Sequence, residues 1–382
     1  MDSAAQRFAS ELLQRLTDRR EAALLRTLDK AAGHDFTSND YLDLSHHPSL
    51  ADAINQTTRE YGTGSGASRL LRGNHPVHTE LERKLAEFSS RDRALLFSSG
   101  FSLNTGLLPA LTSKEDIIFS DALNHASIID GTRLASAKCV IFGHQDFQHL
   151  DNLLEVTPCE GTRFIVTESL FSMDGDLTDL EKLCSVAERH GALVIIDEAH
   201  ATGIYGSHGA GRVQELGLEA RVLATVHTGG KALGVGGAWV ASSGPVIDYL
   251  VNFCRSFIYS TAPIPALAGA LQRAIELRAT LTKEVEHLQH LGEYLRKELN
   301  ERGVDTHTSA SQIVPVMLQT NERALFVAEH LRKDGFDVRA IRPPTVPEGT
   351  ARLRLTLRAS MGYELIDQLV ARILHHIEAC TS

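Results

Sequence analysis

The sequence has neither an excess of basic residues nor a long apolar run. Its 382 residues include 38 Lys and Arg against 48 Asp and Glu, a formal net charge of -10. This balance argues against a nucleic-acid-binding surface, which needs a basic face. No uninterrupted apolar stretch approaches the ~18 residues of a membrane span, and the N-terminus lacks a signal-peptide pattern. We therefore expect a soluble, cytoplasmic protein that binds neither nucleic acid nor membrane.

Cysteine is scarce and unpaired in the sequence. The five cysteines contain no C-x-x-C spacing, and their odd number is typical of reduced thiols in a cytoplasmic enzyme. The 18 histidines include close neighbours such as His144 and His149, but we find no ligand spacing supported by carboxylates. We therefore expect no metal site.

The length exceeds that of one ordinary domain. Short apolar runs alternate with helical patterns as far as residue 241, which predicts a mainly parallel sheet covered on both faces. A helix is expected over 10–30, with Arg26 on it, and a long helix over 274–301. We expect the chain to divide into an N-terminal segment with a helix (1–45), a large domain (46–275) and a small C-terminal α/β domain (276–382). The individual predictions are strands at 94–97, 117–120, 140–142, 164–167, 193–196, 238–241, 313–318, 336–341 and 352–357, and helices at 78–88, 321–334 and 363–379.

Lys231 lies in the glycine-rich stretch VHTGGKALGVGG, where the backbone can approach a ligand closely. Asp197 and His200 follow the predicted strand 193–196, at the edge where α/β sheets bind ligands. A lysine that can form an imine and a fixed aspartate are the pair that a pyridoxal phosphate enzyme needs. Taken alone, the stretch around Lys231 is also typical of a loop with an ordinary solvent-exposed lysine.

Two further motifs have competing interpretations. The strand 94–97 runs through Ser98-Ser99-Gly100-Phe101 into a helical pattern, which predicts a phosphate site at a helix N-terminus, although a plain tight turn fits as well. The segment VIIDEAH (194–200) resembles the Walker B box of a DEAH-type ATPase. That alternative needs G-x-x-x-x-G-K-[ST] upstream, whereas the only candidate lysine lies downstream and is followed by Ala232.

Taken together, the motifs resemble those of the α-oxoamine synthases, which are pyridoxal phosphate enzymes of fold type I. The resemblance covers nearly the whole chain. It implies an α/β fold like that of aspartate aminotransferase, with a large, mostly parallel-sheet domain and a smaller C-terminal α/β domain. It is carried by SNDYL, GSGASRLLRGNHPVHTELE, LLFSSGFSLNTGLLPAL, NHASIIDG, ESLFSMDGD, IIDEAHATGIYG, HTGGKALG, FIYST and IRPPTVPEGTARLRLTL.

The resemblance implies roles around the cofactor ring. Lys231 would hold pyridoxal phosphate as a Schiff base and then carry a proton at the substrate Cα. Asp197 would pair with the pyridine nitrogen and keep the ring protonated. His125 would stack on the ring, His200 would bond the phenolic oxygen, and Ser172 would lie beside the ring.

The resemblance also implies contacts to phosphate and substrate. Gly100, Phe101 and Thr228 would bind the phosphate, and Thr261 would reach the phosphate of a second subunit in a homodimer. The residues that it assigns to the substrate are Arg342, for the amino-acid carboxylate, with Arg26, Asn39 and Thr345. One departure is Asp43, which stands where the family usually has glycine.

The implied reaction condenses L-alanine with a pimeloyl thioester, carried by coenzyme A or an acyl carrier protein, and releases CO2 and the thiol for biotin biosynthesis. This choice rests mainly on residues 341–357. Glycine-using relatives of the 2-amino-3-ketobutyrate ligase or 5-aminolevulinate synthase type share the cofactor residues and stay as the alternative. A catalytically silent partner subunit is disfavoured because such subunits typically lack the lysine.

Overall fold

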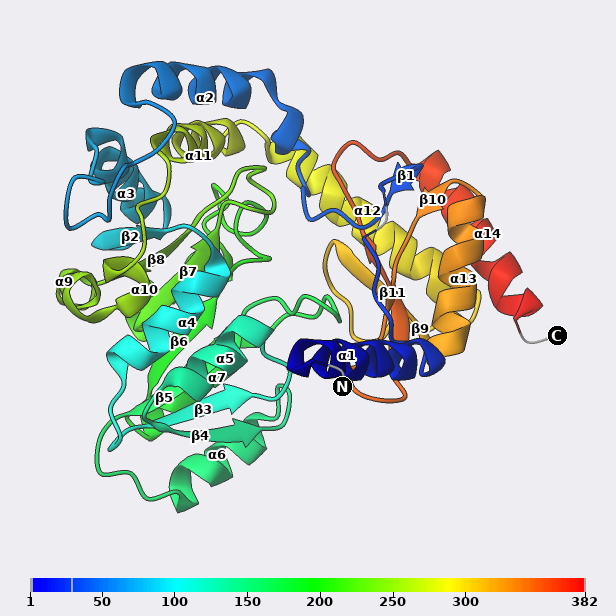
Figure 1. The fold of residues 1–382 in the computed structure, drawn as a ribbon, viewed down its shortest axis with the longest axis horizontal. Helices are drawn as coiled ribbons and strands as arrows, with labels where there is room; N and C mark the ends of the chain where they lie inside the picture. The colour runs from blue at the N-terminus through cyan, green and yellow to red at the C-terminus, as the bar shows by residue number, and fades with distance from the viewer. Residues whose placement is uncertain (1–2, 29, 381–382) are drawn as a thin grey trace.

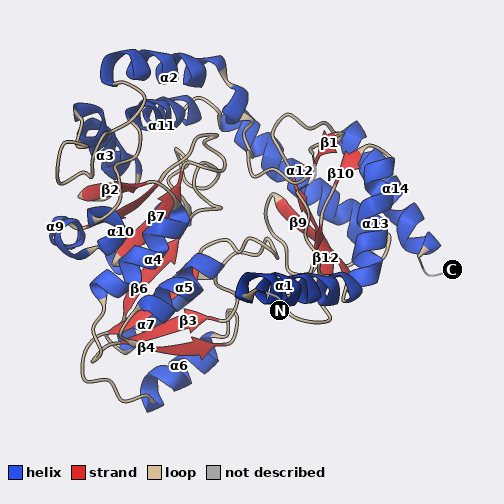
Figure 2. Ribbon diagram, in the orientation of Figure 1, coloured by secondary structure: helices blue, strands red, loops and turns tan. Residues whose placement is uncertain are grey.

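The structure is a computed structural model that describes residues 3–28 and 30–380. Two lobes lie side by side, a large one built on a seven-stranded sheet and a small one built on a three-stranded sheet (Figures 1 and 2). The large lobe contains strands β2 (Arg93–Phe97), β3 (Ile117–Asp121), β4 (Lys138–Phe142), β5 (Arg163–Glu168), β6 (Leu193–Asp197), β7 (Ala224–Thr228) and β8 (Ala238–Ser242).

The large sheet has the strand order β2-β8-β7-β6-β5-β3-β4, and only β8 runs antiparallel to its neighbours. The mainly parallel sheet predicted from the sequence is therefore confirmed. The helices of this lobe are α2 (Pro48–Tyr61), α3 (Pro76–Phe88), α4 (Gly100–Leu111), α5 (Ala126–Leu134), α6 (Phe147–Val156), α7 (Leu180–Arg189), α8 (Arg212–Glu215), α9 (Gly244–Phe253), α10 (Arg255–Ile258) and α11 (Pro265–Arg278), with 3-10 turns at Leu44–His46 and Glu219–Arg221.

Alternating side chains of the strands bury two apolar layers. Ile118 and Val166 face the layer formed with α4, α5 and α9, whereas Phe119 and Ile165 face the layer formed with α6 and α7. This alternation follows from the two-residue period of a strand. Because both faces are covered, the open edge at the carboxyl ends of the parallel strands is left for a ligand.

The small lobe contains helices on an antiparallel sheet with the order β11-β12-β9. Its elements are α12 (Thr282–Asn300), β9 (Ile313–Gln319), α13 (Asn321–Lys333), β10 (Phe336–Asp337), β11 (Ala340–Ile341), β12 (Ala351–Thr356) and α14 (Tyr363–Ala379). The predicted single strand over 336–341 is wrong. Its two halves separate because β10 pairs with the N-terminal strand β1 (His34–Asp35), whereas β11 pairs with β12.

The N-terminal segment differs from the predicted helix over 10–30. Helix α1 (Ala4–Glu21) starts earlier, at a capping box between Ser3 and Gln6, and ends before Ala23, which has a left-handed φ of 54°. Arg26 therefore lies after the helix, and its predicted place on the helix is wrong. Helix α1 buries none of its side chains in this chain.

The long helix predicted over 274–301 is two helices, α11 and α12, which are separated by residues 279–281. Thr280 supplies the physical reason. Both its N–H and its hydroxyl group donate to the carbonyl of Leu277. This carbonyl at the end of α11 therefore has its hydrogen bonds within the turn, and the helix does not continue. The apolar spacing runs through the break, so periodicity alone could not reveal it.

Candidate active site at the carboxyl edge of the large sheet

One cavity lies at the carboxyl ends of β5, β6 and β7 and the N-terminus of α4. These elements are labelled in Figure 1. It brings together seven of the residues that the resemblance assigned to cofactor binding or catalysis. The residues that line it are Gly100, Phe101, Asn104, His125, Ser127, Glu168, Asp197, Ala199, His200, Val226, His227, Thr228 and Lys231.

Lys231 is held in a tight turn that follows β7. Gly234 closes the turn by donating its N–H to the carbonyl of Lys231 and has a φ of 65°. A Cβ at Gly234 would lie 2.3 Å from the backbone nitrogen of Ser45, so only glycine fits there. Burial lowers the pKa of Lys231 to about 8, although the carboxylates of Asp197 and Glu168 partly oppose the shift. Near neutral pH the lysine therefore supplies an appreciable fraction of neutral, nucleophilic amine.

Asp197 ends β6 and is fixed by two hydrogen bonds. Its Oδ2 accepts from Asn104 Nδ2 at 2.8 Å and its Oδ1 from the backbone N–H of Ala199 at 2.9 Å. Asn104 also donates to Ser127 Oγ at 3.0 Å. The aspartate thus presents a rigid carboxylate to the cavity, which suits pairing with a protonated ring nitrogen.

His200 is buried beneath the cavity and is bonded to a tyrosine that the sequence analysis did not single out. Its Nδ1 lies 2.6 Å from the hydroxyl of Tyr41. Burial, followed by the charges of Lys231 and Arg354, lowers the pKa of His200 well below its usual value. Burial also raises the pKa of Tyr41 to about 12. Both groups are therefore neutral near pH 7.

The N-terminus of α4 forms the phosphate side of the cavity. Ser99 caps this helix by accepting from the N–H of Ser102 at 3.2 Å, and the N–H groups of Gly100 and Phe101 have no partner within the helix because they belong to its first turn. A Cβ built at Gly100 would meet nothing within 4 Å, so the space in front of it is open. Thr228 also lines the cavity, where its Oγ1 accepts from the N–H of Gly230 at 3.1 Å and donates to the carbonyl of Gly237 at 3.0 Å. This arrangement of donors suits a phosphate group.

His125 caps the N-terminus of α5. Its Nδ1 lies 2.8 Å from Ser127 Oγ, and its backbone N–H donates to Glu168 Oε1 at 2.6 Å. Glu168 is the last residue of β5 and is opposite Asp197 in the register of the sheet. The signal that pointed to Asp197, a carboxylate at the end of a buried strand, is also present at Glu168, but the sequence analysis did not use it.

Arg354 is a further residue that the sequence analysis missed. It lies on β12 and is buried, and its charge acts on Lys231, Tyr41 and His200. Its Nε donates to the carbonyl of Ser172 at 2.5 Å and its Nη2 to Asn39 Oδ1 at 2.9 Å. No carboxylate among residues 3–28 and 30–380 forms an ion pair with it. A buried guanidinium with only neutral partners is suited to bind an anionic ligand.

Of the remaining predicted residues, Ser172 and Thr345 line a second pocket, whereas Arg26, Asn39 and Arg342 do not line it. Arg26 donates to Thr345 Oγ1 at 3.0 Å, which joins the N-terminal segment to the small lobe. Arg342 donates to the carbonyls of Ala23 and Leu25, so its guanidinium is occupied by the same segment. Thr261 is exposed and does not line the first cavity.

Glu198, the second letter of the DEAH-like segment, points away from the cavity. Its carboxylate accepts from Ser169 Oγ and from the backbone N–H groups of Arg212 and Val213 at the start of α8. This glutamate therefore ties α8 to the sheet, and burial raises its pKa to about 7. The structural role of Glu198 gives no support to the ATPase alternative.

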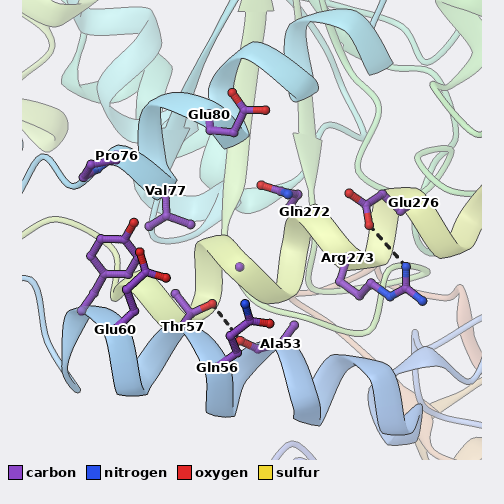
Figure 3. A pocket seen from close by; sticks show the side chains of 12 residues that line it. Ala53, Gln56, Thr57, Glu60, Pro76, Val77, Glu80, Gln272, Arg273 and Glu276 are labelled. Carbon is purple, nitrogen blue, oxygen red and sulfur yellow. Dashed lines mark hydrogen bonds and ion pairs between the residues drawn. The ribbon is translucent and has the colours of Figure 1, made fainter.

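Another hollow lies between α2, α3 and α11 (Figure 3), and none of the residues that line the first cavity lines it. Its charged side chains include Glu60 and Glu80, and the ion pair of Arg273 with Glu276 at 3.3 Å. It holds no lysine or histidine. Over the described part of the chain, no group of three or more His, Cys, Asp or Glu is arranged to hold a metal ion, and no helix is long and apolar enough to cross a membrane.

A lysine with a lowered pKa, a fixed aspartate and an open helix N-terminus at the carboxyl edge of this sheet define a pyridoxal phosphate enzyme of fold type I. The model of the family described as aminotransferase class I and II matches residues 33–373. A serine palmitoyltransferase from S. paucimobilis, solved with a bound PLP–myriocin aldimine, has a TM-score of 0.90 and 27% identity, covering 99% of each chain.

Two other relatives share one name. The 8-amino-7-oxononanoate synthase of Trichlorobacter lovleyi is 45% identical over 343 residues, covering 88% of this chain and 87% of the relative. The crystal structure of 8-amino-7-oxononanoate synthase from Francisella tularensis has a TM-score of 0.80 and 30% identity, covering 92% of this chain and 99% of that one. The chain therefore belongs to the aminotransferase class I and II family and, within it, to the 8-amino-7-oxononanoate synthases. Its cofactor is pyridoxal phosphate.

Proposed function

We propose that the protein condenses L-alanine with a pimeloyl thioester and releases CO2, the free thiol and 8-amino-7-oxononanoate. The observation that carries the proposal is the 45% identity to a synthase of that name over most of both chains. The cavity supports it, because it offers an amine, a carboxylate and phosphate donors on one edge of the sheet.

Bound pyridoxal phosphate supplies an aldehyde that captures the amino group and a ring that accepts the electron pair left at Cα. The protein supplies the rest. Lys231, with a pKa of about 8, can hold the aldehyde carbon covalently and can later remove or return a proton at Cα. Asp197 is fixed by Asn104, so its carboxylate would pair with the ring nitrogen and would favour the protonated ring.

Neutral histidines position the ring without adding charge. His125 is held at the start of α5 by Ser127 and Glu168, where it can cover one ring face. His200 is held by Tyr41, where it can bond the phenolic oxygen. The N–H groups of Gly100 and Phe101 would hold the phosphate, and the hydroxyl of Thr228 would join them by exchanging its bond to the carbonyl of Gly237. Together these residues would hold the ring in one orientation and so would select which bond at Cα is broken.

Arg354 is our candidate for holding the alanine carboxylate, because it is buried near Lys231 with only neutral partners. Arg342, to which the resemblance gave this role, is bonded to Ala23 and Leu25 and would have to leave these carbonyls to reach a substrate. Asn39 accepts from Arg354 and would orient it. Arg26 and Thr345 remain candidates for the acyl substrate at the second pocket.

We further propose a homodimer in which Thr261 reaches the second active site. Thr261 is exposed and outside its own cavity, and α1 leaves Phe8, Leu12, Leu13 and Leu16 exposed. An active protein that stays monomeric in light scattering would refute this proposal. A Thr261→Ala variant should weaken cofactor binding without changing the dimer.

An absorbance titration of the purified protein tests the activity. Alanine should change the cofactor band more than glycine or serine does, and pimeloyl thioester should then release thiol and CO2. Comparison of pimeloyl-coenzyme A with the pimeloyl acyl carrier protein identifies the donor. A preference for glycine with an acetyl or succinyl donor would show a glycine-using sister enzyme. A preference for serine with palmitoyl-coenzyme A would instead match the structural neighbour, whose TM-score is 0.90.

A further inference from the structure

Glu168 lies in the wall of the cofactor cavity and has no assigned role in the reaction. It is 3% exposed, and its backbone ends β5. One oxygen, Oε1, accepts the N–H of His125 at 2.6 Å. The other oxygen, Oε2, has no hydrogen-bond partner within residues 3–28 and 30–380, and it is not one of the fully enclosed polar atoms. It therefore lies at the cavity that Glu168 lines.

The charged groups that act on Glu168 come from the neighbouring strands β3 and β6 and from the turn after β7. Asp197, on β6, is its register partner, and Asp121 lies at the end of β3. Lys231, after β7, supplies the positive charge, and His125 supplies the N–H from the start of α5. Two adjacent buried carboxylates share one lysine, and like charges at such short range do not both ionise readily. Burial, with the charge of Asp197 as the next cause, raises the pKa of Glu168 well above its usual value.

We propose that Glu168 is a neutral positioning residue, which accepts the backbone N–H of His125 through one oxygen and keeps a proton on the other. In this state Glu168 fixes the start of α5 and so the ring of His125. It also leaves Asp197 as the sole anion beside the pyridine nitrogen. The inference rests on the assignment of the cavity to pyridoxal phosphate, and it does not depend on which amino acid or thioester reacts.

Glutamine and alanine at this position separate the two parts of the proposal. Glu168→Gln keeps the shape, the acceptor for His125 and a neutral charge, whereas Glu168→Ala removes the acceptor. The protein has a single tryptophan, Trp239, so quenching of its fluorescence can report the binding of pyridoxal phosphate to apoprotein. We expect Glu168→Gln to stay within about threefold of wild type in Kd and Glu168→Ala to bind ~10- to 100-fold more weakly, because a buried N–H loses its acceptor.

Glu198 provides a matched control because it is also a buried glutamate beside Asp197, but it binds α8 instead of His125. Glu198→Gln should lower stability to urea while leaving cofactor affinity unchanged. Circular dichroism of each apoprotein checks folding. If Glu168→Gln binds as weakly as Glu168→Ala, the neutral state is refuted. If Glu168→Ala binds like wild type, the positioning role is refuted.

Infrared difference spectra of wild-type apoprotein and Glu168→Gln give a readout that does not depend on binding or activity. At pH 8 we expect the wild type to show the carbonyl band of a protonated carboxyl group that the variant lacks. Its absence would overturn the proposal even if the alanine variant failed to fold. Normal cofactor binding and a normal band in a protein that fails to condense alanine with pimeloyl thioester would instead contradict the proposed function alone.

Discussion

We predict that His144 is protonated and bridges two carboxylates. Its replacement should therefore lower the free energy of unfolding, and the loss should depend on pH. Its Nδ1 lies 2.9 Å from Asp121 Oδ1 and its Nε2 lies 2.8 Å from Asp176 Oδ2. Only a protonated imidazole donates from both nitrogens. Partial burial is the largest single cause and lowers the pKa of His144. The hydrogen bonds and charges of the two carboxylates together outweigh it and raise the pKa to about 10.

The size of the effect follows from that pKa. A rise from 6.5 to about 10 corresponds to an upper bound of ~5 kcal/mol. Because the side chain of His144 is 21% exposed, solvent screening reduces this to roughly 2–3 kcal/mol. The folded-state pKa is raised, so the stabilisation is fully present below pH 6.5 and is lost as the pH rises through 10.

Urea unfolding of apoprotein measures the effect. His144→Asn should lower the free energy of unfolding by ~2–3 kcal/mol at pH 7, and the difference from wild type should shrink towards pH 10. His149→Asn is the control, because His149 lies in α6 just after this turn and its side chain only accepts the N–H of Gly143 at 3.1 Å. A difference that stays constant from pH 7 to pH 9.5 would show that His144 is neutral and that the reasoning is wrong.

Three further predictions concern the site and its surroundings. Lys231→Ala should lower turnover by at least ~100-fold and abolish the lysine-dependent cofactor band in absorbance spectra; full turnover would contradict the assignment. Arg354→Met should raise KM for alanine ~10- to 100-fold in steady-state kinetics, and Arg342→Met is the comparison that decides which arginine binds the carboxylate. Asp43→Gly should change the free energy of unfolding in urea by less than ~1 kcal/mol, because it relieves a left-handed φ of 55° but loses the ion pair with Arg358. A larger loss would show that the ion pair dominates.

The sequence predicted the parts of the site that depend on local signals. Lys231 is recognisable because glycines surround it, and Asp197 because it ends a buried apolar strand. The structure places both in one cavity. Arg354 was missed because its neighbours on β12 are apolar and its partners, Asn39 and Ser172, come from distant segments. The available signal was the alternation of two arginines, Arg352 and Arg354, with leucines on a predicted strand.

His144 was passed over because its partners are remote in the sequence. The spacing of His144 and His149 does not match a metal site, and nothing in the sequence links His144 to Asp121 and Asp176, which bond it in the fold. The break between α11 and α12 was hidden for a different reason. Periodicity reports which face of a helix is buried, and it continues through a turn whose hydrogen bonds are satisfied by Thr280.

The pairing of β1 with β10 joins the N-terminal segment to the small lobe. During synthesis on the ribosome, His34 and Asp35 emerge long before Phe336 and Asp337 exist, so β1 cannot pair until the chain has been synthesised as far as β10. Non-local pairing of this kind is slow because the intervening chain must first be ordered. The segment that contains Arg26, which bonds Thr345, would therefore take its place against the small lobe only after β10 has been synthesised.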